Sequence, residues 1–148
     1  MRLAGRMERI GTETAFEAAA RARALFRHAA RRALAVHSPD RALVVLERAL
    51  AMAPGDTERR LLLEEAASAA RISGRLDVAE QHLRALLAEE DEAAEPGDDQ
   101  RDRHRAQLAS VLLMAHHNAE ALDELESAVG FAAGVDAGDP EPSTTELI

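Results

Sequence analysis

Six histidines are the side chains of this chain best suited to hold a metal ion or to transfer a proton near neutral pH. Helical zinc sites place two histidines at positions i and i+4 beside a carboxylate, as in the HExxH motif. The chain contains no HExxH and no inward-facing histidine pair of that spacing with a carboxylate as third ligand. We therefore expect the histidines at the surface and in turns, and from His116 and His117 no more than a weak divalent-metal contact in purified protein. The histidines are His28, His37, His82, His104, His116 and His117.

Other catalytic motifs are also missing from the sequence. There is no cysteine, no phosphate loop of the form GxxxxGK[ST], no GxGxxG and no GxSxG. A run of acids around residues 89–99 could attract cations, but it lacks the spacing of a calcium-binding loop, and solvated charge is the simpler interpretation. We predict a protein that is not an enzyme, with no catalytic residues, no cofactor and no metal site.

The composition favours helices packed at short distances. The 148 residues suffice for one domain with a core; 47% of them are hydrophobic, but only 2% are aromatic, and Trp and Tyr are absent. Alanine and leucine must therefore supply most of the packing, which suits helices better than sheets.

The charge distribution limits the classes of partner. The formal net charge is −9, and arginines outnumber acids only within residues 1–36. An acidic body argues against nucleic-acid binding. The basic N-terminal helix either docks on an acidic surface, such as that of a sister subunit, or is a solvated face. No apolar run approaches the roughly 20 residues of a membrane span, and the start lacks the apolar core of a secretory signal, so we expect a soluble cytoplasmic protein without a membrane partner.

Apolar residues three and four apart predict six amphipathic helices. Thr12 or Thr14 is expected to cap the first, Ser38 followed by Pro39 the second, and Asp56 the third, while Gly74 ends the third. The predicted helices span about residues 14–36, 39–53, 57–73, 75–90, 103–115 and 119–132. The predicted buried stripe of the first includes Phe16, Ala19, Ala22, Phe26, Ala29, Ala30 and Ala33, and that of the sixth Ala121, Leu122, Leu125, Ala128 and Val129.

These helices divide into three units within one domain. We expect a flexible N-terminus over 1–12, a helical domain over 13–133 and a disordered tail over 134–148. The units span about 14–55, 56–91 and 99–133, with an acidic loop over 92–98 between the second and third units.

The second helices of the three units share a pattern. Each has an alanine, a leucine four residues later and a small or apolar residue three beyond that, and the units recur after 37 and then 42 residues. A helix pair recurring at such a period is typical of a stacked helical array. The matching positions are Ala42, Leu46 and Ala49; Ala79, Leu83 and Leu86; and Ala121, Leu125 and Ala128.

Over about residues 23–133 the chain resembles the tetratricopeptide repeat family. The second-helix pattern, with Pro54 after the first unit and Gly74 between two helices, is close to that family's consensus. The first helices match less well, since the usual aromatic places hold Phe26, Leu63 and Arg105 and the usual tyrosine places Ala33, Ala70 and Leu112. The resemblance implies an all-α fold: a right-handed stack of antiparallel helix pairs, an α-solenoid of about six helices.

The resemblance also implies a concave groove that binds an extended peptide or a partner's helix. Arginines there would suit an acidic segment, because guanidinium pairs with carboxylates bidentately, although they could also serve only as solvated groove residues. The lysines and asparagines with which some family members grip a terminal carboxylate are missing here. Mapped by similarity, the groove presents Arg27, Arg31, Glu64, Ser68, Arg71, Arg103, Gln107 and Ser110.

We therefore expect a non-catalytic protein–protein interaction module, an adaptor or a self-assembling scaffold in a bacterium. Three units are the minimum for stability, so an exposed end face is expected, which favours a homodimer or a higher oligomer. The alternative is a stand-alone or truncated regulatory segment, since such helices also resemble the repeat arrays of bacterial transcriptional activators and signalling ATPases. The final Glu-Leu-Ile could add as a strand to a partner's sheet edge.

Overall fold

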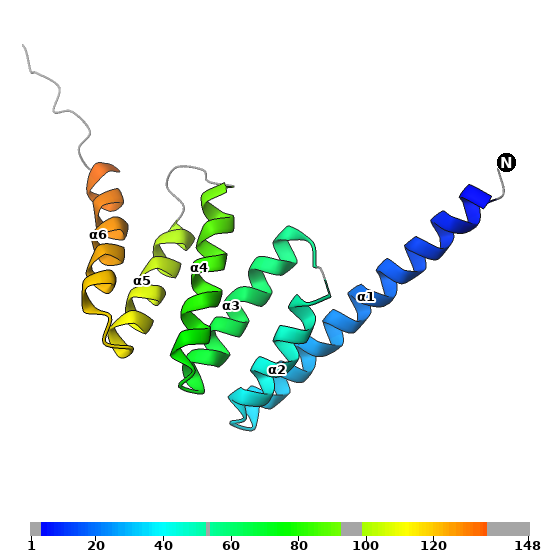
Figure 1. Ribbon diagram of the computed structural model, residues 1–148, viewed down its shortest axis with the longest axis horizontal. Helices are drawn as coiled ribbons and strands as arrows, with labels where there is room; N and C mark the ends of the chain where they lie inside the picture. Colours follow the sequence, from blue (N-terminus) through cyan, green and yellow to red (C-terminus); the bar gives the residue numbers. More distant parts are fainter. Residues whose placement is uncertain (1–3, 53, 93–98, 136–148) are drawn as a thin grey trace, which may run out of the picture.

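A computed structural model of the chain describes the backbone of residues 4–52, 54–92 and 99–135 and the side chains of residues 11–52, 54–92 and 99–129 (Figure 1). Within these residues the chain is all-helical, with six helices and no strand, as the sequence predicts. The helices are α1 (Ala4–Ala35), α2 (Pro39–Leu50), α3 (Asp56–Ile72), α4 (Leu76–Glu92), α5 (Asp99–Met114) and α6 (Asn118–Val135).

The helices follow one another in a row, and each packs mainly on its neighbours in the chain (Figure 1). Polar contacts also join alternate helices. Arg27 of α1 bonds to Glu65 of α3, and Arg84 of α4 bonds to Glu120 of α6. The odd-numbered helices therefore lie beside one another, and so do the even-numbered ones.

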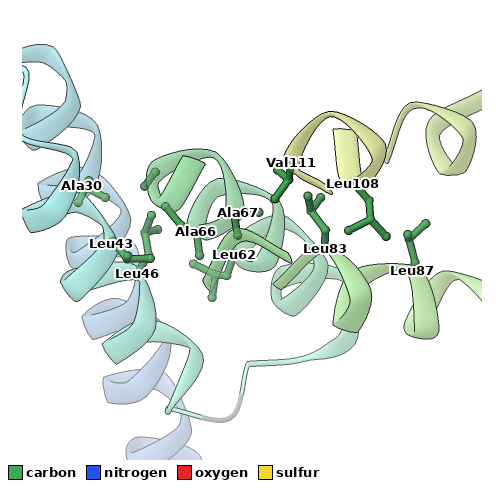
Figure 2. Close-up of a cluster of buried hydrophobic side chains, with 14 of the residues drawn as sticks. Ala30, Leu43, Leu46, Leu62, Ala66, Ala67, Leu83, Leu87, Leu108 and Val111 are labelled. Carbon is green, nitrogen blue, oxygen red and sulfur yellow. The ribbon is translucent and has the colours of Figure 1, made fainter. Parts of the chain in front are cut away.

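Leucine and alanine make the core. Figure 2 shows leucines of α2, α3, α4 and α5 in one cluster with buried alanines of α1 and α3. Ala42, Ala66 and Ala79 are fully buried. Because a methyl group adds little width, the backbones of adjacent helices can approach closely at these points. The largest side chains with almost no exposure are Leu43, Leu46, Leu62, Leu83, Leu86, Leu108, Leu112, His104 and Val111.

The turn within each helix pair is the same in all three units. The N–H groups of Ser38, Arg75 and His117 donate to carbonyls five residues earlier, at 2.8, 2.9 and 2.8 Å. The residues just before them, His37, Gly74 and His116, have φ of 55°, 76° and 66°. This left-handed residue with its backward hydrogen bond is the Schellman ending of a helix. The predicted turns at these three places are therefore confirmed.

The helix starts differ from the predicted caps. The first helix begins at Ala4 rather than at Thr12 or Thr14, and Thr14 Oγ1 donates to the carbonyl of Gly11 inside the helix. Residues 4–12, predicted to be flexible, thus belong to α1, where Gly5 and Gly11 are the weakest helix formers among mostly helix-compatible residues.

Later boundaries also shift. Gly55, not Asp56, occupies the N-cap of α3, and Ser38 holds the N-cap of α2 without a side-chain hydrogen bond. Helix α5 begins four residues before the predicted start and α6 extends through Val135, which includes the first two residues of the predicted tail. The rest of that tail, 136–148, and most of the acidic loop, 93–98, lie outside the described residues.

The predicted buried stripes of α1 and α6 are wrong at the ends of the row. Phe16 is 69% exposed, Leu122 56% and Val129 64%, and Leu125 is 37% exposed. The first part of α1 projects past α2 (Figure 1), and no helix follows α6 among the residues that the structure describes. Amphipathic periodicity identifies a face but not whether a neighbour exists for it.

One arginine anchors α1 where it enters the row. Arg23 is 3% exposed. Its Nε donates to Glu58 at 2.8 Å and its Nη1 to the carbonyl of Met52 at 3.2 Å. Because its charge is paired and hydrogen-bonded, the guanidinium can be buried at this point.

Of the helices that the structure describes, none combines the length and the apolar character needed to cross a membrane.

Candidate functional site

Two hollows lie along α3 and α5, with α4 beneath them, and both are bordered by Glu64. We call them together the α3–α5 groove. The first has a volume of about 350 Å³ and is lined by Glu64, Ala67, Ser68, Arg71, Leu83, Ala106, Gln107 and Ser110. The second has about 280 Å³ and is lined by Thr57, Arg60, Leu61, Glu64, Leu86, Glu90, Gln100 and His104.

Five of the eight predicted groove residues line the first hollow. They come from one side of α3 and the facing side of α5, because residues three and four apart share a helix face. These five are Glu64, Ser68, Arg71, Gln107 and Ser110. Of the other three, Arg103 is exposed on α5 and its Nε donates to the carbonyl of Asp99, one turn earlier in the same helix.

Arg27 and Arg31 point at α3 and are engaged there. Arg27 donates to both oxygens of Glu65, at 3.1 and 2.5 Å, and Arg31 lies 3.8 Å from the same carboxylate. The hydrogen bonds that Arg27 donates to Glu65 are the main reason why the pKa of the Arg27 guanidinium is raised, while partial burial opposes the shift. A bidentate pair of this kind holds α1 to α3 and leaves Arg27 less free to bind a ligand.

Arg60 and Arg71 are the groove arginines that form no ion pair with any residue the structure describes. They lie at opposite ends of the groove, on either side of Glu64 along α3. Leu61, 41% exposed, adds apolar surface beside Arg60. The groove therefore offers two separated cations with the carboxylate of Glu64 between them, which suits a segment whose acidic groups are set apart rather than adjacent.

A buried histidine and two carboxylates form the most polar part of the groove. His104 is 2% exposed, its Nδ1 lies 2.8 Å from Glu90 Oε1, and its Nε2 lies 3.6 Å from Glu64 Oε1. The second oxygen of Glu90 is buried and has no hydrogen-bond partner among the described residues. The trio joins α3, α4 and α5, and it fixes the walls of the groove relative to each other.

The expectation that the histidines lie at the surface and in turns is wrong for His104, and this role was missed. A signal was present, because His104 occupies the repeat position of Leu62, a fully buried residue of the preceding unit. A polar residue at a position that packing requires to be apolar indicates a buried polar contact.

A second cluster of ionisable groups lies away from the groove. Ligand atoms of Glu80, His117 and Glu120 lie within 4.8 Å of one another, but the residues are exposed or half-buried. Arg84 bridges the two carboxylates, at 2.9 and 2.8 Å, and the carboxylate of Glu80 raises the pKa of its guanidinium. The arginine thus neutralises the charge that a metal ion would need.

Comparisons of the chain with protein-family models, with curated proteins and with solved structures found no match. The likeness to tetratricopeptide repeats therefore stays a prediction, and any function must be argued from the chain's own geometry.

Proposed function

We propose that the chain is a non-catalytic protein–protein interaction module that binds a peptide or helix of a partner protein in the α3–α5 groove. The observation that carries the proposal is the groove itself: two adjoining hollows along α3 and α5, with an arginine at each end that forms no ion pair among the described residues. A segment that carries one acidic group near each end would satisfy both cations.

The repeat architecture supports the same reading. The three helix-pair turns share one hydrogen-bond pattern. Polar contacts join α1 to α3, α2 to α4, and α4 to α6. Two layers of alternate helices with one repeated turn are what a tetratricopeptide-like stack of antiparallel pairs would produce. In such a stack the inner layer of first helices faces the ligand, and α3 and α5 belong to that layer.

Arg27 and Arg31 were predicted to contact the ligand, but both lie against Glu65. A ligand that used Arg27 would have to compete with an existing bidentate pair, so we assign the ligand contact to Arg71 and Arg60. The loss of either cation would remove a charge-assisted hydrogen bond from the complex.

A peptide selection tests this function. Immobilised protein would be offered a displayed library of peptides enriched in Asp, Glu and Leu, and the dissociation constants of selected peptides would be measured by fluorescence anisotropy. Arg71→Ala should weaken binding at least about tenfold, as loss of an interface arginine commonly does. The matched control is Arg48→Ala, because Arg48 is exposed on α2, outside the groove, and forms no ion pair within the described residues.

Two results would contradict the proposal. One is a selection that enriches no peptide over a library passed across unfolded protein. The other is a set of enriched peptides that bind the Arg71→Ala and Arg60→Ala variants as tightly as the unaltered chain.

A further inference from the structure

Both ends of the row of helices expose apolar side chains. At the end formed by α6, three of them lie at i, i+3 and i+7 on one face, which we call the tail face. At the end formed by α1, an exposed apolar face lies on that helix, which we call the head face. The tail face consists of Leu122, Leu125 and Val129. The head face consists of Leu25, Ala29 and Val36.

The tail face repeats a contact that is closed inside the row. Leu125 occupies the repeat position of Leu46 and Leu83, which are 0% and 2% exposed, whereas Leu125 is 37% exposed. Figure 2 shows Leu83 of α4 in one buried cluster with Leu108 of the next helix. The tail face thus corresponds to the surfaces of α2 and α4 that are covered by the next helix, α3 or α5.

The head face is the other half of the same contact. Leu25 and Ala29 precede Leu62 and Ala66 by one period of 37 residues. Leu62 and Ala66 are fully buried in a cluster with Leu43 and Leu46 of the preceding helix, whereas Leu25 is 70% exposed. Helix α1 therefore keeps the apolar residues of a first helix, although no described helix covers them as α2 covers those of α3.

The charges around the two faces are opposite. A hollow of about 420 Å³ at the head end brings Arg32 and Arg41 beside Ala29 and Val36, and neither arginine forms an ion pair within the described residues. On α6 the described side chains include four acids and no arginine. Asp123 and Glu126, both exposed, have no ion pair within the described part of the chain.

This complementarity selects among the ways in which two copies could meet. Two tail faces would bring Asp123 and Glu126 against the same acids, and two head faces would bring arginines together, so both isologous contacts are opposed by like charges. A tail face against a head face pairs acids with arginines and covers apolar residues on both sides. Such a heterologous contact forms rings or open chains.

We propose that the chain assembles head to tail, with the tail face of one copy covered by the head face of a second copy. The joint would reproduce the α2–α3 and α4–α5 contacts between molecules, so that α1 of the second copy takes the place of a seventh helix. The inference concerns faces outside the α3–α5 groove, and it stands or falls independently of peptide binding there.

The test is self-association measured by sedimentation velocity over a concentration series. The unaltered chain should show a weight-average mass that rises with concentration. Leu25→Glu and Leu125→Glu should each weaken association at least about tenfold, which corresponds to the loss of one interface anchor. Both side chains are exposed, and circular dichroism checks that each variant remains folded. Ile72→Glu is the matched control, since Ile72 is 56% exposed on α3, away from both faces, and should not alter association.

Mixing the two variants supplies the decisive measurement. Leu25→Glu keeps a working tail face and Leu125→Glu a working head face, so an equimolar mixture should form a heterodimer that stops there. Arg71→Ala should associate as the unaltered chain does, which separates this test from that of the groove. The inference is overturned if the unaltered chain stays monomeric at its highest soluble concentration, if either folded variant associates normally, or if the mixture fails to dimerise.

Discussion

The middle of the row and its two ends carry the same residue pattern but differ in burial. Leu46 and Leu83 are almost inaccessible, while Leu125 at the equivalent position is 37% exposed. Leu62 is fully buried, and Leu25 one period earlier is 70% exposed. In a linear array each joint is closed by two helices. A leucine at the same repeat position therefore contributes more to stability in the middle of the row than at an end.

The largest difference in stability between the middle and an end is expected when the leucine at the common repeat position is replaced by alanine. Leu46→Ala should lower the free energy of unfolding by about 2–5 kcal/mol, because it leaves a cavity among packed side chains. Leu125→Ala should cost well under half as much, since part of that side chain is already in water. Chemical denaturation of the two variants measures both values. Equal losses would show that the end of the row is as tightly packed as its middle.

A smaller effect is expected from enlarging an alanine. Ala79→Leu should cost about 1–3 kcal/mol, because Ala79 is fully buried and additional carbons overpack the joint. Ala119→Leu adds the same carbons at an exposed position of α6 and should leave stability within a few tenths of a kcal/mol. Thermal melts of both proteins give the comparison, and an unchanged melting temperature for Ala79→Leu would count against the close helix approach.

The smallest effect should be the contribution of His82 to the pH dependence of stability. His82 is half-buried in the middle of the row. Burial is the main cause that lowers the pKa of His82, partly offset by Glu47, whose Oε1 lies 3.6 Å from the ring, too far for a hydrogen bond. The unfolded chain then binds more protons than the folded one, so stability should fall as pH drops below about 6.5. His82→Gln should flatten this slope.

The control for that measurement comes from an end of the row. His28 is exposed on α1, and His28→Gln should leave the slope of unfolding free energy against pH unchanged. If both variants had the same slope as the unaltered chain between pH 5 and 7, burial of His82 would not be the source of the dependence.

Local features of the fold were predictable from the sequence. Periodicity located six helices, and the breaks at His37, Gly74 and His116 were expected from the residues around them. Five predicted groove residues do line one hollow, because their spacing places them on facing sides of α3 and α5. These predictions depend on contacts within a helix or between neighbouring helices, which sequence spacing encodes directly.

Contacts between distant residues were not predictable in the same way. The pairing of Arg27 with Glu65 and the anchoring of Arg23 by Glu58 depend on how α1 lies against α3. Phe16 was expected to be buried because its face continues that of Ala30, yet α1 runs past its neighbours. Periodicity contains no information on where the adjoining helix ends.

The length of α1 has a mechanical consequence. Its 32 residues make a rod of about 48 Å, whereas the 12 residues of α2 span about 18 Å. Side chains 11–18 are all exposed, so this arm gains little of the packing energy from which helices in proteins draw most of their stability. The contacts of Arg23 with Glu58 and Met52 are therefore what anchors the base of this arm, and their loss should let the projecting part of α1 fray.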